Sequence, residues 1–459
     1  MKRFNGFYGC TFCYAFGKSI GRKHVYPVGN SSEQLRIDDE MRADMMKSFA
    51  DKNEIKGIKG PSALMLLPLF NLSKGMIVDS MHCCFLGVIK WHTKLLLKKD
   101  YKDVIINNKK KKVVVDYYIG RPGQKEEIDS LFLAIMPHNI RSRLPRSINT
   151  LATWKASEWR NWLEYCVICL KNILPDKYLD HLALLSEAVN ILNSDCITPE
   201  RLEHSNYLLE NYVKLFQRYF GLKNMTYNIH LLTHITATVR DWGPFWSNST
   251  FVFESWNRRI VNKITSPHSP CSQITDRYLL SKYLFSCGED DSIAKETRNN
   301  IRKLMRLPLD GSSHEKIVGR GKATKIKPDK YKKLVFAKSG FYPDYLYCYS
   351  RGTVNGVSYN CRRTKETKFC NSLIYCDNIG FGEILKFVCF SIENTTVSGI
   401  ILQSYEEIIN DLSVSYIKKV KCTDNSIFVD DKTIFSPAIK ISFKENLYFL
   451  KLPNSWETD

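Results

Sequence analysis

The amino-acid sequence predicts an α+β protein, with a mainly helical amino-terminal and central region followed by a small antiparallel β-barrel domain. Two patterns carry this expectation. From about residue 151 to 290, apolar residues recur every three or four positions, which is the period of an amphipathic helix. From about Phe341 the chain changes to short β-branched and aromatic runs separated by Gly, Asn and Asp, which is typical of strands and tight turns.

Composition limits the class of protein. The chain has 459 residues, 44% of them hydrophobic, which is enough for two or three domain cores. Its formal charge of +20 favours nucleic acid as a partner. The sequence shows neither a signal-peptide pattern nor an apolar run long enough to span a bilayer, so we expect an intracellular protein with no membrane contact. Its 15 cysteines are then expected as reduced thiols or metal ligands.

Changes in composition divide the chain into four stretches. Residues 1–150 hold a cysteine-bearing start and apolar helices, and residues 151–300 are the periodic helical core. Residues 301–340 are strongly basic and are expected as a solvated linker. Residues 341–459 are expected as the β-barrel.

Four short sequences predict local structure. The lysine run Lys109–Lys112 favours a loop, and Thr198-Pro199-Glu200 is typical of a helix start. Asn355-Gly356 predicts a two-residue turn between strands. Asp430-Asp431 lies between two apolar runs and predicts the end of a hairpin.

Two pairs of metal-binding side chains lie far apart in the sequence. Cys10 and Cys13 form a C-x-x-C pair, and His230 and His234 in "HLLTH" are spaced to lie on one face of a helix. Together they can supply a tetrahedral Cys2His2 site, which favours structural Zn2+. His24 is an alternative local ligand, and the histidines can equally be ordinary core residues.

A second C-x-x-C pair and one glutamate have competing interpretations. Cys166 and Cys169 lie inside a predicted apolar helix, where buried thiols are the commoner outcome. Glu254 lies four residues before Arg258 and can form an exposed helical ion pair. It can also be a metal-binding carboxylate, but a two-magnesium nuclease needs several such acids.

Five motifs together resemble the transposases of CACTA-type elements, the EnSpm-like DDE transposases of the CMC superfamily. They are the C-x-x-C pair, "VDSMHCCFLGVIK" at 78–90, "HLLTH", "DWGPFW" and "FESWN". The chain is more distantly similar to the catalytic subunit of the V(D)J recombinase. The resemblance implies zinc on Cys10, Cys13, His230 and His234, Glu254 as the last catalytic acid, DNA as partner and a nuclear location.

The chain departs from this family at its amino-terminal end. Such nucleases carry two further acids before the C-x-x-C, whereas "MKRFNGFYG" contains none and the first acid of this chain is Glu33. We therefore expect an amino-terminally truncated or domesticated remnant, a partial RNase H-like fold with a helical insertion, that binds nucleic acid without strand transfer. Mg2+ would be needed only if catalysis is retained. A homodimer or a full-length transposase is a further expected partner.

Two other functions stay open. One is an active DDE transposase fragment that needs upstream sequence, and the other is a protein-interaction module. Asp79 and His82 match a D-x-M-H stretch of the family, and a helix cap by Asp79 explains it equally well. Six basic residues suit phosphate contact, although each can equally be solvated: Arg258, Arg259, Lys263, Lys325, Lys327 and Lys330.

Overall fold

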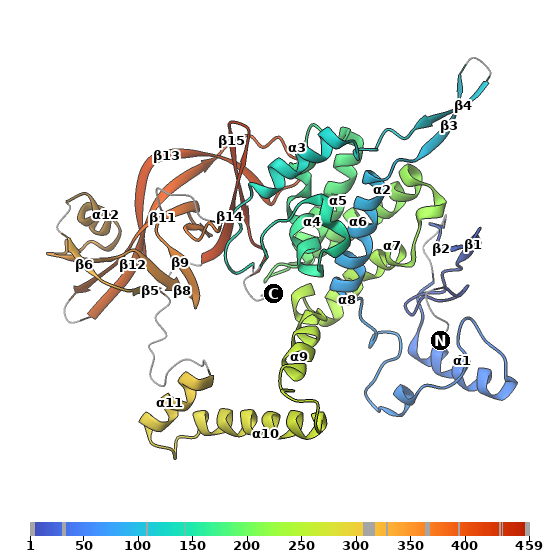
Figure 1. The fold of residues 1–459 in the computed structure, drawn as a ribbon, viewed down its shortest axis with the longest axis horizontal. Helices are drawn as coiled ribbons and strands as arrows, with labels where there is room; N and C mark the ends of the chain where they lie inside the picture. Colours follow the sequence, from blue (N-terminus) through green and yellow to red (C-terminus); the bar gives the residue numbers. More distant parts are fainter. Residues whose placement is uncertain are drawn as a thin grey trace.

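The computed structural model describes residues 5–29, 34–106, 109–141, 143–305, 317–326, 329–362, 368–392, 395–430, 433 and 435–454. Helices occupy the amino-terminal and central parts, and long strands occupy the carboxy-terminal part, which is coloured orange to red in Figure 1. The predicted α+β class and the small carboxy-terminal barrel are therefore confirmed.

The amino-terminal segment is small and mostly irregular. Its elements are β1 (Lys18–Ile20), β2 (Lys23–Val25), α1 (Asp38–Asp51) and η1 (Ala63–Leu66). β1 and β2 form an antiparallel hairpin. Buried Met41 and Met45 on α1 pack with Ile58 and Leu72 in a core of their own. So small a core stabilises little, and contacts with the helical region must hold this segment in place.

The helical region forms the main core. Its elements are η2 (Met81–Ile89), α2 (Lys90–Leu97), α3 (Pro122–Leu133), η3 (Ile148–Thr153), α4 (Ala156–Leu170), α5 (Asp176–Leu192), α6 (Pro199–Phe220), η4 (Leu222–Asn224), α7 (Tyr227–Leu231), η5 (Leu232–His234), α8 (Ile235–Trp242) and η6 (Phe245–Asn248). Every residue of α4 is buried, so this helix is central. Thr198 accepts a hydrogen bond from the Arg201 N–H and Pro199 occupies the first turn of α6. The predicted start of this helix is confirmed.

The π-helical segment η2 lies directly against α7. At Gly87 a Cβ atom would stand 2.3 Å from Nδ2 of Asn228 and 2.7 Å from the backbone oxygen of His82, so a larger residue would force these groups to shift. The Cys83 thiol also donates to the backbone oxygen of Asn228 at 3.5 Å. This packing places the D-x-M-H stretch beside the helix that begins the histidine motif.

The lysine run does not form a loop. Strands β3 (Tyr101–Ile106) and β4 (Lys109–Val114) pair antiparallel, with Tyr101 opposite Val114 and Ile106 opposite Lys109. The hairpin projects from the helical region at the upper right of Figure 1. The prediction of a loop at Lys109–Lys112 is wrong because strand pairing satisfies the backbone while the lysine side chains stay in solvent.

Three helices leave the helical region as an arm (Figure 1): α9 (Phe251–Val261), α10 (Pro270–Glu289) and α11 (Lys295–Met305). No residue of α9 is buried. Large apolar side chains are exposed along α9 and α10, namely Val252, Phe253, Trp256, Ile260, Val261, Tyr278, Leu279, Leu280, Tyr283 and Phe285. Exposed apolar surface of this extent is typical of an interaction site.

The carboxy-terminal region closes into a six-stranded antiparallel barrel. Its strands are β10 (Leu373–Cys376), β11 (Gly380–Ile392), β12 (Thr395–Glu407), β13 (Ile417–Asp430), β14 (Phe435–Phe443) and β15 (Asn446–Lys451). The order is β10-β14-β15-β13-β12-β11, and β10 also pairs with β11, which closes the barrel. Register shifts between Ile384 and Lys386 and between Gln403 and Tyr405 mark bulges, which bend long strands enough for closure.

Shorter elements extend this region. They are β5 (Ile317–Arg320), β6 (Thr324–Ile326), α12 (Asp329–Ser339), β7 (Leu346–Tyr349), β8 (Arg351–Val354) and β9 (Val357–Asn360). β6 and β7 continue the sheet from β11, while β5, β8 and β9 form a separate sheet. The described residues of the expected 301–340 linker therefore include strands that pair with the β region.

The two predicted turns have different outcomes. Asn355 and Gly356 connect β8 to its partner β9 with φ angles of 48° and 79°, so this turn is confirmed. β15 lies between β13 and β14 in the sheet, so Asp430-Asp431 does not close a hairpin. That prediction is wrong because β13 and β14, which follow each other in the sequence, are not neighbours in the barrel. Asp431 itself lies outside the described residues.

The barrel packs directly on the helical region. Ile417, Ile439 and Leu450 of the barrel belong to the same apolar core as the residues of α4 and α5. The hydroxyls of Ser186 and Tyr416 are 2.6 Å apart, and the backbone N–H of Ser415 donates to Glu187 at 2.7 Å. The β region is thus held against α5 by both apolar and polar contacts.

Helix length and hydropathy bear on membrane contact. In the part of the chain that the structure describes, no helix is both long and apolar enough to cross a bilayer.

Candidate metal centre

The two distant pairs of metal-binding side chains meet in one buried cluster. Cys10 and Cys13 are fully buried, and His230 and His234 are 7% and 6% exposed. All four ligand atoms lie within 4.8 Å of one another. η5 interrupts the helical segment between the two histidines, yet both rings still face the cysteines. The structure therefore brings together the four residues that the sequence and the resemblance indicate.

The spacing of the ligand atoms fits a tetrahedral zinc site. Cys10 Sγ lies 3.6 Å from His234 Nε2, Cys13 Sγ lies 3.3 Å from His230 Nε2, and the two Nε2 atoms are 3.3 Å apart. Zinc bonds of about 2.3 Å to sulfur and about 2.0–2.1 Å to nitrogen would place tetrahedral ligand atoms about 3.6 Å (S to N) and about 3.3 Å (N to N) apart. The cluster can hold a metal ion such as zinc with little rearrangement.

The surroundings favour thiolate sulfur. The backbone N–H groups of Phe12 and Ala15 point at the Cys10 and Cys13 sulfurs, each at 3.4 Å. Burial alone would raise the pKa of the Cys10 thiol, but hydrogen bonds with Cys13 and the two histidines lower it to about 2. Zinc binds the deprotonated sulfur, so the hydrogen bonds that favour the Cys10 thiolate also favour metal binding.

Aromatic rings fix the two histidines. Phe12 stacks on His234 with ring centroids 5.1 Å apart and planes 18° apart. Tyr26 stacks on His230 at 5.2 Å and 21°. Stacking restricts rotation of each imidazole, so both Nε2 atoms stay directed at the cysteines.

Arg36 holds the cysteine loop, the segment from Cys10 to Cys13, through hydrogen bonds to its backbone. The sequence alone did not indicate this role. Its Nε donates to the carbonyl oxygens of Cys10 and Cys13 at 2.9 and 3.0 Å, and its Nη2 donates to Lys56 at 2.9 Å. The side chain is 3% exposed. Burial of the guanidinium lowers the pKa of Arg36 from its ordinary value. The only sequence signal was an arginine near a C-x-x-C pair, which is too common to single it out.

The competing ligands lie outside the cluster. His24 packs between the rings of Phe7 and Tyr26, each with centroids 5.5 Å away. Cys166 and Cys169 are buried free thiols in α4, and burial raises the pKa of both. Their interpretation as structural residues is supported. Among the described residues, the Cys2His2 cluster is the only group of three or more Cys, His, Asp or Glu side chains close enough to share a metal.

Glu254 lies on the first turn of α9 and is exposed. It belongs to no acidic group close enough to share a metal among the described residues. The ion pairs described there do not include a bond between Glu254 and Arg258 either. Among the described residues Glu254 is therefore an exposed carboxylate without an ion pair to Arg258, and its metal-binding role stays a prediction.

Asp79 forms hydrogen bonds with His82 and with Thr250, and so connects η2 to the start of α9. The Asp79 carboxylate accepts from the N–H of His82 at 3.0 Å and lies 2.5 Å from its Nδ1. It also accepts from the backbone N–H and hydroxyl of Thr250, at 3.0 and 2.8 Å. Burial of Asp79 opposes ionisation, but these hydrogen bonds together lower the pKa of its carboxyl. Asp79 thus caps η2 and also holds the residue that precedes α9, which supports the capping interpretation.

The six basic residues do not converge. Arg258 and Arg259 are exposed on α9, whereas Lys325 on β6 and Lys330 on α12 are exposed beside the barrel. Lys263 donates to Ser281 Oγ at 3.1 Å and thereby ties α9 to α10. Lys327 lies outside the described residues. Figure 1 places α9 and α12 in different parts of the molecule, so these residues do not outline a single binding surface.

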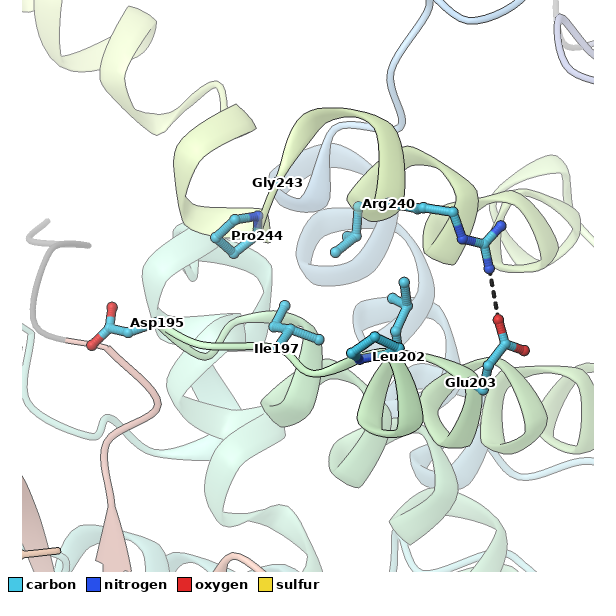
Figure 2. Close-up of a pocket in the computed structure, with 9 residues that line it drawn as sticks. Asp195, Ile197, Leu202, Glu203, Arg240, Gly243 and Pro244 are labelled. Atoms are coloured by element: carbon cyan, nitrogen blue, oxygen red, sulfur yellow. Dashed lines mark hydrogen bonds and ion pairs between the residues drawn. The ribbon is translucent and has the colours of Figure 1, made fainter.

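A pocket of about 410 Å³ opens where the start of α6 meets the end of α8. Figure 2 shows the Arg240 side chain reaching Glu203 at one side of it, where the two groups form an ion pair of 2.7 Å. None of the candidate ligands or basic residues lines it. The pocket is separate from the metal centre, and Asp195, Glu203 and Arg240 are its charged lining residues.

Comparison with known proteins gives no family for this chain. No protein-family model matches it, and no curated protein or solved structure does either. The metal centre is therefore inferred from the geometry of its four ligands.

Proposed function

We propose that this chain is a transposase-derived protein of the nucleus that binds DNA, is stabilised by one structural zinc ion, and does not cut or join DNA. The single observation that carries the proposal is the convergence of Cys10, Cys13, His230 and His234. These residues are the ligand set that the resemblance to CACTA-type transposases implies, and the cysteines lie more than 200 residues before the histidines.

Charge supports the DNA partner. The net charge of +20 creates a field that attracts phosphates at long range. Neutralising phosphates releases condensed counterions, so binding of this kind weakens steeply as salt rises. The zinc ion contributes only structure here, because two thiolates and two imidazoles fill a tetrahedral shell and leave no position for a substrate.

The surroundings of Glu254 support the lack of strand transfer. A two-metal nuclease needs several carboxylates to hold two ions for in-line displacement. Glu254 is exposed and lies in no shared metal group among the described residues. Asp79 is held by four hydrogen bonds to Thr250 and His82, and its position is explained by capping.

The finer fold assignment is also part of this proposal. We infer that the helical region derives from the insertion region of an RNase H-like transposase. Among described residues 5–305 the paired strands are two hairpins, β1–β2 and β3–β4. The strands of an RNase H-like sheet would therefore come from outside the described residues, either from upstream sequence or from a partner such as a full-length transposase.

The test combines binding and cleavage. Purified chain and a labelled DNA duplex are mixed at increasing salt, and binding is followed by fluorescence anisotropy. Cleavage of end-bearing DNA is measured with Mg2+ or Mn2+ for the natural chain, for Glu254→Gln and for the matched control Glu296→Gln on α11. We expect salt-sensitive binding and no product. Product that vanishes only in Glu254→Gln would establish the alternative, an active transposase fragment.

One observation favours a protein-interaction module as a second candidate. α9 and α10 expose many large apolar side chains, among them Phe253 and Leu280. A second copy of the chain, or a full-length transposase, would cover them. Sedimentation of the natural chain should then show a dimer, and Phe253→Ser with Leu280→Ser should leave a monomer. A monomer at every concentration, together with absent DNA binding, counts against both candidates.

A further inference from the structure

The β3–β4 hairpin concentrates positive charge away from the body of the protein. Lys109, Lys110, Lys111 and Lys112 follow one another on β4 and are all exposed. The hairpin stands out from the helical region in Figure 1. Both of its long faces are therefore open to a partner.

Strand geometry distributes the lysines over both faces. Successive side chains of a strand point to opposite sides, so Lys109 and Lys111 share one face and Lys110 and Lys112 share the other. The register places Lys111 opposite Val104 and Lys110 opposite Ile105. The one acid on these strands is Asp103, which lies opposite Lys112. At its outer half the hairpin thus carries charge of one sign on each side.

The base of the hairpin is fixed to the helices. Asp100, just before β3, accepts from Lys223 at 3.1 Å. Asp116, just after β4, accepts from Lys177 at 2.7 Å and from the Tyr178 hydroxyl at 2.8 Å. An isolated two-stranded hairpin is only marginally stable, so these contacts set its direction.

The four lysines repel one another, and a negatively charged partner would relieve this repulsion. Like charges that lie close together on one strand repel each other, and only Lys112 of the four lies opposite an acid, Asp103. In the described structure none of these four lysines takes part in an ion pair, whereas Lys102 near the base pairs with Asp116 at 3.3 Å. A polyanion would remove the repulsion, and the major groove of duplex DNA, about 12 Å wide, admits a two-stranded ribbon.

We propose that the β3–β4 hairpin is a basic arm that enters a groove of duplex DNA and contacts phosphates through Lys109–Lys112. This inference rests on the proposed DNA binding and assigns that binding to a surface. It differs from the basic residues singled out from the sequence, of which the described ones lie on α9, just after α9 and beside the barrel.

The experiment compares three variants of the full chain. In the first, Lys109, Lys110, Lys111 and Lys112 all become Gln. In the second, the same four become Arg, which keeps the charge. The matched control changes four exposed lysines elsewhere to Gln, namely Lys47, Lys59, Lys295 and Lys303. Equal thermal unfolding temperatures show that all variants are folded, and affinity for a labelled duplex is measured across a salt series.

We expect the slope of log affinity against log salt to become shallower by up to about 3.6 in the hairpin Gln variant, because each lost phosphate contact contributes about 0.9. The Arg variant should keep the natural slope, and the dispersed control should change it by less than half as much. If the natural chain binds and the hairpin Gln variant has the same slope as the control, the arm is not the contact surface. If the natural chain itself fails to bind duplex DNA, the proposed function fails and the arm with it.

Discussion

The carboxylate of Asp79 holds Thr250, which lies 171 residues later and directly precedes α9. Both the backbone N–H and the hydroxyl of Thr250 donate to it, while the same carboxylate caps η2 through His82. One side chain therefore fixes the point at which the α9–α11 arm leaves the helical region. A second anchor is Phe251, whose ring centroid lies 6.2 Å from that of Phe85 and 5.5 Å from the Arg160 guanidinium, although α9 has no fully buried residue.

Replacing Asp79 by Ala should loosen the arm. The loss of a cap usually costs about 1–2 kcal/mol, and here two helix starts lose their acceptor together. We expect a lower free energy of unfolding and faster proteolysis within residues 251–305. Urea unfolding and timed digestion measure both. Asp39→Ala, at an exposed position of α1, is the control. Equal digestion of the two variants would mean that Asp79 does not anchor the arm.

Metal content tests the Cys2His2 site. The purified chain should carry about one zinc ion, since one cluster of suitable geometry is present among the described residues. Cys10→Ser and His234→Ala should each lose the metal and destabilise the amino-terminal segment, because the site ties this segment to α7 and η5. Elemental analysis and hydrogen exchange are the measurements. The matched control is the double variant Cys166→Ala and Cys169→Ala, which removes the other C-x-x-C pair and should keep the metal.

Arg36 should slow the release of zinc although it is not one of the four candidate ligands. Arg36→Leu removes four hydrogen bonds, to the carbonyl oxygens of Tyr8, Cys10, Cys13 and Lys56. Groups that orient metal ligands typically change metal affinity by about 10–100-fold, so we expect at least about tenfold faster loss of zinc to a chelator. Arg42→Leu breaks comparable bonds to Met65 and Phe70 in the same segment and serves as control. Similar release from both variants would show general loosening and not positioning of the ligands.

Local patterns explain what could be predicted from the sequence. The period of apolar residues indicated the helices of 151–290, and Thr198-Pro199 marked the start of α6. Asn355-Gly356 predicted its turn because two consecutive residues with positive φ favour this pair. The ligand set needed only residue types and spacing, together with a family resemblance that supplied the long-range pairing.

Long-range contacts explain what could not be predicted. Nothing near Lys109–Lys112 indicates that they pair with Tyr101–Ile106, since lysine is uncommon in strands. The Asp430-Asp431 prediction failed because β15 inserts between β13 and β14. Arg36 could not be identified as a brace because its acceptors are backbone oxygens, which leave no trace in residue types.

The last prediction concerns Asp116 at the base of the β3–β4 hairpin. Burial alone would raise the pKa of its carboxyl, but hydrogen bonds from Lys177, Tyr178 and Lys102 lower it below the ordinary value of 3.8. A carboxyl with a lowered pKa stabilises the folded state above its unfolded pKa, and this stability is lost as pH falls through the folded pKa. Asp116→Asn should therefore unfold more easily than the natural chain at neutral pH.

The expected difference is about 1 kcal/mol, the size for a half-exposed ion pair with an added hydrogen bond. It should stay constant from pH 7 down to about pH 5, begin to shrink as pH falls through about 3.9, the pKa of the unfolded carboxyl, and approach zero only below the lowered pKa of the folded carboxyl. Urea unfolding of both chains across this pH range measures it, and the metal site contributes equally to both and cancels. Asp103→Asn, on β3 itself, is the control for an Asp-to-Asn change in the same hairpin. A difference that persists unchanged at the lowest pH would mean that Asp116 acts through its shape and not through its charge.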